Sequence, residues 1–485
     1  MAYQHGVRVL EQETSVNTPI EGNAGLQVVF GTAPVNLAAD PYGVTNKPVI
    51  AYNYAEAVAQ LGYSDDFENY TLCQSIYASF KLFGVAPVIF VNVLDPAQHK
   101  KVNEAVTANV VDMQAVINVT GILPDTVTVK AAETVLAVDT DYILTFDSTG
   151  KLVITLTASG AGADAESLTV ESTSIDPTMV TVDDLIGTVD AATGKETGME
   201  VLRQVYPKFG LTPGLLLAPG WSQEPAVGVL LAAKCEEING YFKCECLIDI
   251  DSTTDGAVVY TAVKEEKSDA GCSSKHSGAL WPCVAVGSRI LWYSAVYGAL
   301  TAYTDANNDD VPSLSPSNKL LGITGTVLAD GTEVNLDQIQ ANTLNEIGVI
   351  TAINVNGWRS WGNNTAAYPG TTDPKDRWFC CRRFFSWWGN SFIQTYAQKV
   401  DDPANYRLIE SIVDSENIRG NAYVAQDKCA AAYIEFSEAE NTIEKLLNGQ
   451  IRFHQHLAPY VPAEDIVNTL EFDTDALRSA LNGGE

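Results

Sequence analysis

Residues 215–250, LLLAPGWSQEPAVGVLLAAKCEEINGYFKCECLIDI, contain the pattern that decides the fold. An apolar run at residues 215–217 stops at an Ala-Pro-Gly turn, and the stretch 225–239 is typical of a helix that ends at Gly240. A second apolar run follows at residues 242–250, and its length is that of a buried strand. Strand–helix–strand units of this kind build a sheet that helices cover.

The same alternation occurs nearer the N-terminus. Residues 26–30 form a short apolar run, and a helix is expected to begin after the N-cap Asn53 and to end at Gly62. A second helix with one apolar face is expected to end at Gly84, and residues 88–94 then form another strand. These units predict a second part of the same sheet.

The alternation is interrupted after residue 104. Residues 105–185 include twelve acidic and two basic side chains, with no Cys and no Trp. Runs such as residues 142–146 and 151–156 are rich in β-branched residues with period two and are separated by turn residues, which predicts a small antiparallel β domain. Because the α/β pattern resumes afterwards, we interpret this domain as an insertion, and its acidity indicates an outward, solvated position.

We therefore predict an α+β or α/β multidomain protein with a mixed sheet core and flanking helices, an inserted antiparallel β domain, and extended N- and C-terminal arms. The predicted segments are an N-terminal arm (1–22), a first part of the core (23–104), the acidic β domain (105–190), a second part of the core (191–345), a C-terminal domain (346–464) and a C-terminal arm (465–485).

The composition limits the partners. The 485 residues include 60 acidic and 29 basic side chains, for a formal net charge of −31. A field of that sign repels phosphate backbones and anionic lipids, so we expect no nucleic-acid partner and no membrane insertion.

Residues 284–304 are long enough to span a membrane but contain Arg289 and several small residues, so we expect a buried helix over residues 288–303. The first 13 residues have no secretory pattern, and we expect no signal peptide.

Both ends contain short alternating segments without a partner of their own. Near the start, Val7 and Val9 flank Arg8. Near the end, one face of an expected strand consists of Ile466, Asn468, Leu470 and Phe472. Because an isolated strand is not stable in water, we expect these segments to be completed by strand exchange with other copies of the chain.

One pattern is typical of an enzyme. Asp249 and Asp251 follow an apolar strand, where phosphohydrolases of the haloacid dehalogenase type hold their nucleophile and acid. That chemistry also needs a Lys and a downstream carboxylate pair for magnesium, but the doublet Asp309-Asp310 follows no apolar strand. A phosphohydrolase that uses Asp249 and Asp251 is therefore the alternative hypothesis, beside the simpler interpretation of a solvated strand end.

A calcium loop is suggested by Asp305, Asn307 and Asp309. The sixth position of that loop requires Gly and holds Asp310, and the twelfth requires Glu and holds Pro316. A polar turn is the better interpretation.

The cysteines and histidines do not form a convincing metal set. Cys235, Cys244 and Cys246 have no nearby His, and His454 and His456 share a strand face without a carboxylate or Cys in ligand spacing. The nine scattered cysteines indicate reduced, buried thiols in a cytosolic compartment. No GxSxG, GxxxxGK[ST] or GxGxxG motif occurs, so we expect no catalytic residues, no cofactor and no metal.

The C-terminal domain contains an unusual basic and aromatic run. Residues 375–388 include Arg382 and Arg383 among Trp, Phe and Cys. Arg with aromatic residues can stack on nucleic-acid bases, but the same residues are enriched at protein–protein contacts, and the net charge favours the latter. An interface and the subunit core both remain open for this run.

Several segments together resemble the contractile tail sheath proteins of bacteriophages and of phage-tail-like bacteriocins. They are HGV (5–7), VVFGTAP (28–34), GVAPV (84–88), VNV (91–93), PGL (213–215), APG (218–220), SPSNK (315–319), NVNGW (354–358), WGNNT (361–365), Arg382-Arg383 and the stretch 401–417. Their order and joint presence make the resemblance specific, and they cover nearly the whole chain except residues 105–190.

The resemblance implies a structural subunit rather than an enzyme. Such subunits stack as sixfold rings in a helical tube around an inner tail tube, with a tube-proximal C-terminal domain, outward insertions and arms that complete the sheets of neighbouring subunits. Partners would be other copies, the tube protein, and the baseplate and terminator proteins. The protein would be assembled in the bacterial cytoplasm as part of a virion tail or a released tail-like particle. A non-contractile binding or surface-layer protein is a further alternative, which would form no hollow tubes.

The resemblance also implies a mechanism. An extended, metastable sheath would repack into a wider and shorter lattice and drive the tube through a cell envelope without a nucleotide. Contacts with the tube or with neighbouring subunits are expected from Arg382 and Arg383, and from Arg407, Glu410 and Asp414, which lie on the polar face of a helix that starts at Asp402-Pro403.

Overall fold

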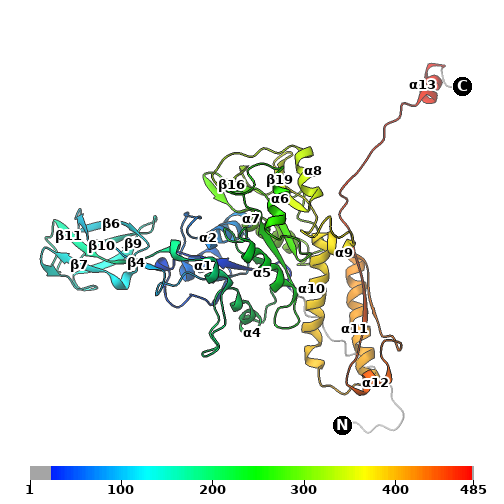
Figure 1. The fold of residues 1–485 in the computed structure, drawn as a ribbon, viewed down its shortest axis with the longest axis horizontal. Coiled ribbons are helices and arrows are strands. Elements are labelled where there is room, and N and C mark those ends of the chain that lie inside the picture. The colour runs from blue at the N-terminus through cyan, green and yellow to red at the C-terminus, as the bar shows by residue number, and fades with distance from the viewer. Residues whose placement is uncertain (1–22, 483–485) are drawn as a thin grey trace, which may run out of the picture.

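An eight-stranded mixed sheet forms the centre of the body (Figure 1). The computed structural model describes residues 23–482. The strand order is β2 (Pro48–Ala51), β3 (Val88–Asn92), β1 (Gln27–Gly31), β13 (Leu215–Leu217), β14 (Glu245–Asp249), β15 (Ser277–Leu280), β19 (Val349–Asn354) and β20 (Trp358–Trp361). Pairs from β3 to β19 are parallel, and β2 and β20 are antiparallel edges. Every side chain of β1, β3, β13, β14 and β15 is buried, as expected where helices cover both faces.

Helices surround this sheet, and those predicted before Gly62, before Gly84 and within residues 225–239 are present. They include α1 (Tyr54–Leu61), α2 (Leu72–Ile76) with a π-helical continuation (Tyr77–Phe83), α3 (Val182–Ile186), α4 (Val205–Phe209), α5 (Pro225–Glu236), α6 (Val263–Asp269), α7 (Tyr293–Ala306) and α8 (Gln338–Glu346). The side chain of Asn53 caps α1 by accepting from the backbone N–H of Glu56, and Gly62 follows its last residue. Gly84 ends the second helix in the left-handed region, with φ of +66°. The predicted unit β13–α5–β14 is confirmed.

The helix predicted over residues 288–303 is wrong at its start. Residues Arg289–Leu291 form strand β17, which pairs with β16 (Cys283–Val286) across a turn at Gly287, and β18 (Gly325–Val327) completes the small sheet. The turn explains the difference, because Gly287 has a φ of +61° that favours a tight hairpin over a continuing helix. Helix α7 begins only at Tyr293.

The inserted β domain is a separate sandwich with its own core (Figure 1). One sheet has the order β5 (Val106–Asn109), β11 (Ser167–Glu171), β7 (Thr128–Ala131), β8 (Thr134–Val135), and the other has the order β6 (Gln114–Thr120), β10 (Lys151–Leu156), β9 (Tyr142–Phe146). A pair of short strands, β4 (Lys100–Val102) and β12 (Thr173–Ile175), joins it to the body. The fold class predicted from the sequence is confirmed, including this antiparallel insertion.

The C-terminal unit lies at the opposite end of the molecule from the insertion (Figure 1). It consists of α9 (Pro374–Arg377), α10 (Phe379–Tyr396), α11 (Tyr406–Ala425), β21 (Cys429–Glu435), α12 (Ile443–Leu447), β22 (His454–Pro459) and α13 (Thr474–Leu481). The boundary predicted at residue 346 needs correction, because β19 and β20 follow it and still belong to the central sheet.

Candidate assembly site

The hairpin of β21 and β22 has one open edge, along β22, because Asn417 of α11 pairs with the backbone N–H and C=O of Ile434 at the other edge. The two strands pair antiparallel from Cys429 with Pro459 to Glu435 with His454, and α11 packs beside β21. No third strand joins this sheet in the part of the chain that the structure describes, residues 23–482. An edge strand presents unpaired backbone N–H and C=O groups, so the hairpin is a template for strand addition.

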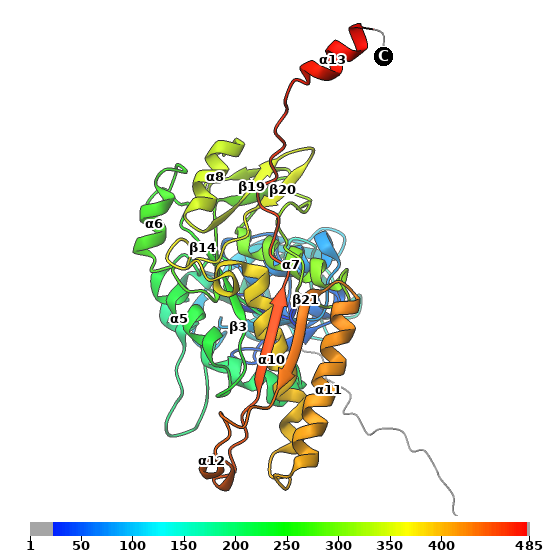
Figure 2. The same ribbon diagram turned by 90° about the vertical axis from the view of Figure 1, so that its right-hand side faces the viewer.

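A groove of about 700 Å³ runs along β22. Its lining is mainly apolar and includes Cys381 and Phe385 of α10 and Leu457, Pro459 and Val461 of the hairpin and the segment after it. In Figure 2 the orange-red β22 runs beside the orange β21, and α10 lies behind the two strands, which agrees with this lining. An open strand edge beside an apolar groove offers backbone partners and side-chain pockets for an added strand.

Beyond residue 465 the C-terminal arm leaves the body, and the side chains of residues 466–482 are all exposed (Figures 1 and 2). Residues 461–473 are extended but have no ladder partner, and α13 follows them. The exposed fractions of Ile466, Leu470 and Phe472 are 86%, 87% and 72%, and Asn468 is exposed as well. The strand predicted for this arm is therefore absent from the single chain, because a strand needs a second backbone for its hydrogen bonds.

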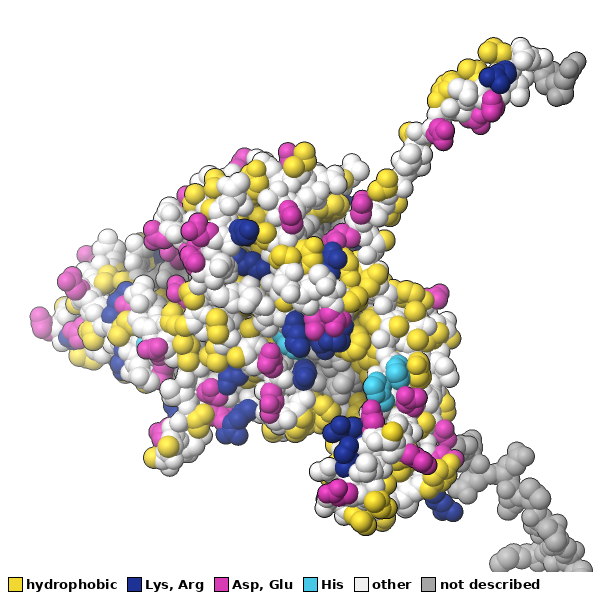
Figure 3. All heavy atoms as spheres, turned by 45° about the vertical axis from the view of Figure 1, so that its right-hand side comes forward, with side chains coloured by type: hydrophobic (Ala, Val, Ile, Leu, Met, Phe, Trp, Pro, Cys, Tyr) yellow, Lys and Arg dark blue, Asp and Glu magenta, His cyan; other side chains and the backbone are white. Residues whose placement is uncertain are grey.

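Val7, Arg8 and Val9 lie outside the described residues. Figure 3 shows hydrophobic side chains along the C-terminal arm, clear of the main surface. An apolar arm that stays exposed in one copy is a candidate ligand for the groove of another copy.

The basic and aromatic run lies in the subunit core. Arg383 of α10 is 1% exposed and donates from both terminal nitrogens to Asp305 of α7, and it also donates to the carbonyl oxygen of Ala24. Arg382 is buried and pairs with Asp376 at 3.0 Å. These two side chains are used within the subunit, so the expected tube or subunit contact from them is corrected to a core role.

The same core is rich in aromatic rings. The guanidinium of Arg419 from α11 lies 4.2 Å from the ring of Trp388 and 5.3 Å from that of Trp387, and both rings pack on Tyr423. Arg419 also pairs with Glu416 at 3.4 Å. Burial raises the pKa of the Glu416 carboxyl. These contacts fasten α11 to α10 and hold the hairpin in place.

The outer face of α11 is exposed. Arg407, Glu410 and Asp414 are all exposed on it, as the sequence predicts. The helix does not start at Asp402, however, because Asn405 is the N-cap and accepts from the backbone N–H of Leu408 at 3.0 Å. Asn405 directly precedes the first helical residue, so its side chain can bind the free backbone N–H of Leu408 in the first turn. Asp402 lies three residues earlier and is too distant from that N–H.

Asp249 and Asp251 do not form a catalytic pair. Asp249 is buried and accepts from the hydroxyls of Ser222 and Ser294 and from the backbone N–H of Ser294. Asp251 forms a local turn by accepting from the backbone N–H and hydroxyl of Thr253. The phosphohydrolase alternative has no support from this arrangement, since the carboxylate that would act as nucleophile is enclosed by serine donors.

The burial of Asp249 gives a testable pH effect. Burial raises the pKa of this carboxyl from 3.8 to about 6. The unfolded chain loses this proton at lower pH, so this group makes the protein less stable by about 3 kcal/mol as the pH rises from about 4 to above 6. We expect Asp249→Asn to stabilise the protein by about 1–2 kcal/mol at pH 7.5 and to have little effect at pH 4.5. Urea titration at both pH values measures this, and equal effects at both would contradict it.

The metal hypotheses find no site. Among the described residues, no group of three or more His, Cys, Asp or Glu side chains has a geometry that could hold a metal ion. Asp305 pairs with Arg383, and Asp309 pairs with Lys428 at 2.9 Å. Two carboxylates of the suspected calcium loop are therefore engaged in ion pairs within the subunit. The sulfurs of Cys235 and Cys244 lie 3.6 Å apart and are buried.

The histidine pair is better partnered than its sequence indicates. His454 and His456 stack at 4.5 Å between ring centroids, and each has a Glu oxygen within 3.4 Å, from Glu440 and Glu435. The sequence spacing missed these carboxylates because one comes from the partner strand and one from a loop.

Over residues 23–482, no helix combines the length and the apolar character that crossing a bilayer requires.

Sequence reasoning also missed a polar socket where the arm leaves the body. It is built from Ser315, Ser317, Asn363, Asn364 and Arg377 around Glu464. Four of these lie in the SPSNK and WGNNT segments, so the only sequence signal was their place in a family pattern, with no chemical motif.

Comparison with known proteins agrees with this architecture. No protein-family model matches the chain. The tail sheath protein of Burkholderia phage BcepMu is 28% identical over 495 residues, which cover 99% of each chain. The tail sheath protein of Escherichia phage P2 is 25% identical over 304 residues, which cover 59% of this chain and 69% of that protein.

Solved structures share the fold at low sequence identity. The PVC sheath complex of an extracellular contractile injection system, in its contracted state, has a TM-score of 0.58 and 13% identity over 99% of this chain and 100% of that one. The contracted helical sheath of the anti-feeding prophage has a TM-score of 0.57 and 14% identity over 98% and 100% of the two chains. The resemblance predicted from the sequence is therefore confirmed: along nearly its whole length this chain is similar to a tail sheath protein, and it shares the fold of the subunits in these contracted sheaths.

Proposed function

We propose that this chain is the structural subunit of a contractile tail sheath, which polymerises around an inner tail tube and contracts to drive it through a cell envelope. One observation carries the proposal: the hairpin β21–β22 has an open edge beside an apolar groove, and the same chain has an exposed apolar arm that its own body does not use. In a homologue of tail sheath proteins, this combination supports assembly by strand exchange.

The principal partner is another copy of the chain. Residues 466–472 of one subunit would add as a strand to the hairpin of a second subunit, with alternate side chains in the groove. Residues 7–9 would supply another strand in the same manner. Heterologous contacts of this kind form a ring where the rotation between neighbours closes and a helical array where it does not. The assembly we propose is therefore a stack of sixfold rings in a helical tube, and not a dimer.

Contraction would be a change between two lattices. The extended sheath is held in a metastable state, and a trigger from the baseplate lets subunits repack into a wider and shorter lattice. The driving free energy is stored in the assembly, so no catalytic residue, nucleotide or metal is required. We propose accordingly that the protein is not an enzyme.

The position of each part in the sheath follows from the same proposal. The acidic β domain, 105–190, faces outward, and the C-terminal unit up to residue 464 faces the inner tube. The tube protein, the baseplate and the terminator are the remaining partners. Assembly would take place in the bacterial cytoplasm, and the product would be a virion tail or a released tail-like particle.

The polar face of α11 is the proposed contact with the tube or an adjacent subunit. We expect the combined variant Arg407→Glu, Glu410→Arg and Asp414→Arg to fold normally, because all three side chains are exposed, and to lower the yield of tubes at least about tenfold, because like charges oppose docking. Sedimentation of assembled material measures the yield. Glu133→Arg, an exposed change in the outward β domain, alters the net charge equally and is the control; equal yields from both variants would remove this contact.

The direct test of the function is negative-stain electron microscopy of the purified chain. Tubes with a hollow centre are expected. Particles that remain monomeric at every concentration, or sheets without a central channel, would contradict a sheath and favour a binding or surface-layer protein.

A further inference from the structure

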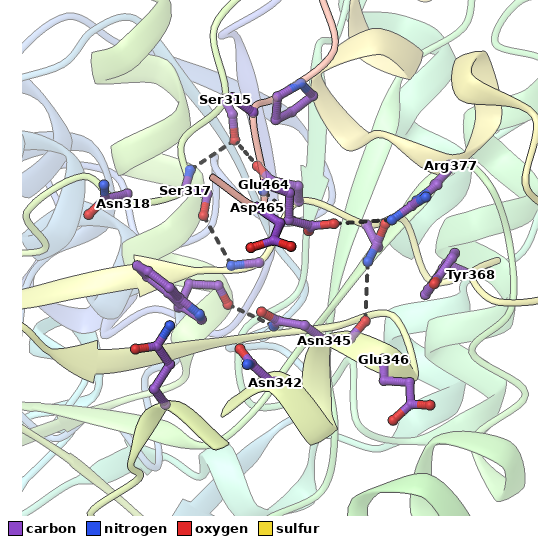
Figure 4. A pocket seen from close by; sticks show the side chains of 17 residues that line it. Ser315, Ser317, Asn318, Asn342, Asn345, Glu346, Tyr368, Arg377, Glu464 and Asp465 are labelled. Carbon is purple, nitrogen blue, oxygen red and sulfur yellow. Dashed lines mark hydrogen bonds and ion pairs between the residues drawn. The ribbon is translucent and has the colours of Figure 1, made fainter. Parts of the chain in front are cut away.

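A polar cavity of about 630 Å³ lies where the C-terminal arm leaves the body (Figure 4). Loop residues 315–318, the end of β20, one face of α8 and Arg377 surround it, and residues 462–465 pass through it. Residues 466–482 beyond this point are all exposed. The cavity therefore holds the last part of the arm that contacts its own subunit.

Arg377 is oriented by its neighbours before it meets the arm. Its Nε donates to Asn364 Oδ1 at 3.0 Å, and its guanidinium stacks 4.0 Å from the ring of Trp378 and 4.6 Å from that of Tyr368. Its terminal nitrogen Nη2 donates to Glu464 Oε2 at 3.1 Å. A guanidinium held on three sides loses little entropy when it binds a carboxylate.

The second oxygen of Glu464 has a partner as well. Asn363 Nδ2 approaches Glu464 Oε1 at 3.5 Å, and the hydroxyl of Ser315 donates to Asn363 Oδ1 at 2.5 Å, which fixes the orientation of the amide. Ser317 supports the same loop by accepting from the backbone N–H of Gly362 at 3.1 Å. Asp465, the next carboxylate, lines the cavity without a hydrogen bond or ion pair among the described residues.

We infer that Arg377 and Asn363 are positioning residues, which clasp Glu464 and set the direction in which the C-terminal arm leaves the subunit. This inference rests on the proposed function and adds a specific role to the socket. An arm whose root is fixed searches fewer directions before it reaches the hairpin of another copy, so less entropy is lost on assembly. The side chains of Arg377 and Glu464 are 26% and 35% exposed, so water can compete for the pair and the clasp can open when the lattice repacks.

Spin labels can report the direction of the arm in the unassembled chain. Ile339→Cys on α8 and Val467→Cys on the arm are exposed sites, whereas the native cysteines are buried. We expect a narrow distance distribution between the labels in the otherwise unchanged chain, a clearly broader one with Glu464→Ala, and an intermediate one with Glu464→Gln, which keeps an acceptor for Arg377. Asp465→Ala is the matched control and should leave the distribution unchanged.

The same variants without labels test the effect on assembly. Glu464→Ala should raise the protein concentration needed for tube formation about two- to fivefold, as expected for loss of a partly exposed charged pair, and Asp465→Ala should not. An unchanged distance distribution in Glu464→Ala would overturn the clasp even if tubes form normally. If the unchanged chain forms no tubes, the proposed function fails, and the distance measurement still decides whether the clasp exists.

Discussion

Deletion of residues 466–485 is expected to leave a folded subunit that no longer forms tubes. The side chains of residues 466–482 are exposed, so their loss should change the free energy of unfolding by less than about 1 kcal/mol. The open edge of β22 would then lack the strand that completes it. Urea titration measures the stability, and electron microscopy with sedimentation measures the assembly; we expect the same loss of tubes when residues 1–15 are deleted.

Single prolines separate strand pairing from a general need for the arm. A strand added at one edge donates to its partner only from alternate residues, so Asn468→Pro and Thr469→Pro should differ strongly in tube yield. A plain loss of apolar surface would not distinguish the two positions. If both truncated chains still form normal tubes, or if the two prolines have equal and small effects, strand exchange is not the basis of assembly.

Arg383→Met is expected to destabilise the protein by about 3–5 kcal/mol. The guanidinium is buried and pairs with Asp305, and it also binds the carbonyl oxygen of Ala24. Burial raises the pKa of the Asp305 carboxyl, and the charge of Arg383 opposes that rise. Loss of the arginine would leave a buried carboxylate without its counter-ion, which costs more than the pair contributes. Urea titration at pH 7.5 checks this.

A second variant shows whether the missing charge partner is the cause. Arg383→Met combined with Asp305→Leu removes both charges and should recover most of the lost stability, since apolar pairs often replace buried ion pairs at little cost. Equal losses in the single and double variants would mean that packing of α10 on α7, rather than the ion pair, dominates. Arg407→Met, at an exposed position on α11, is the control for loss of an arginine and should have an effect below about 0.5 kcal/mol.

Local signals in the sequence were sufficient for four strands of the central sheet, β1, β3, β13 and β14, but not for β2, β15, β19 and β20. The apolar runs and punctuating turns of residues 215–250 predict β13, α5 and β14, and the Asn53 cap and Gly84 stop are where the chain places them. The period-two runs of residues 105–185 predict an antiparallel domain, which the structure has. In each case the determining interactions lie within a few residues of one another.

Features that depend on distant contacts were not predictable in this way. Arg382 and Arg383 looked available for a partner because their carboxylates, Asp376 and Asp305, cannot be assigned from spacing. The short strand β17 was taken for a helix because an apolar run of that length is ambiguous, and the hairpin at Gly287 decided it. Composition gave no sign that Arg377, Asn363 and Glu464 would meet.

The assembly surface is an intermediate case. Alternation at residues 466–472 identified an arm that needs a partner, and the structure shows that arm exposed. The groove that could receive it combines α9, α10 and the hairpin, which are separated by up to about eighty residues in the chain. Sequence periodicity identifies a strand that lacks a neighbour, but the identity of the neighbour is a property of the tertiary and quaternary structure.

A cryo-electron microscopy map of tubes assembled from the purified chain tests the central claim most directly. The account predicts density for residues 466–472 hydrogen-bonded along the hairpin β21–β22 of a different copy, with side chains in the groove beside β22. A map in which this arm folds back onto its own body, or a chain that stays monomeric at high concentration, would contradict it.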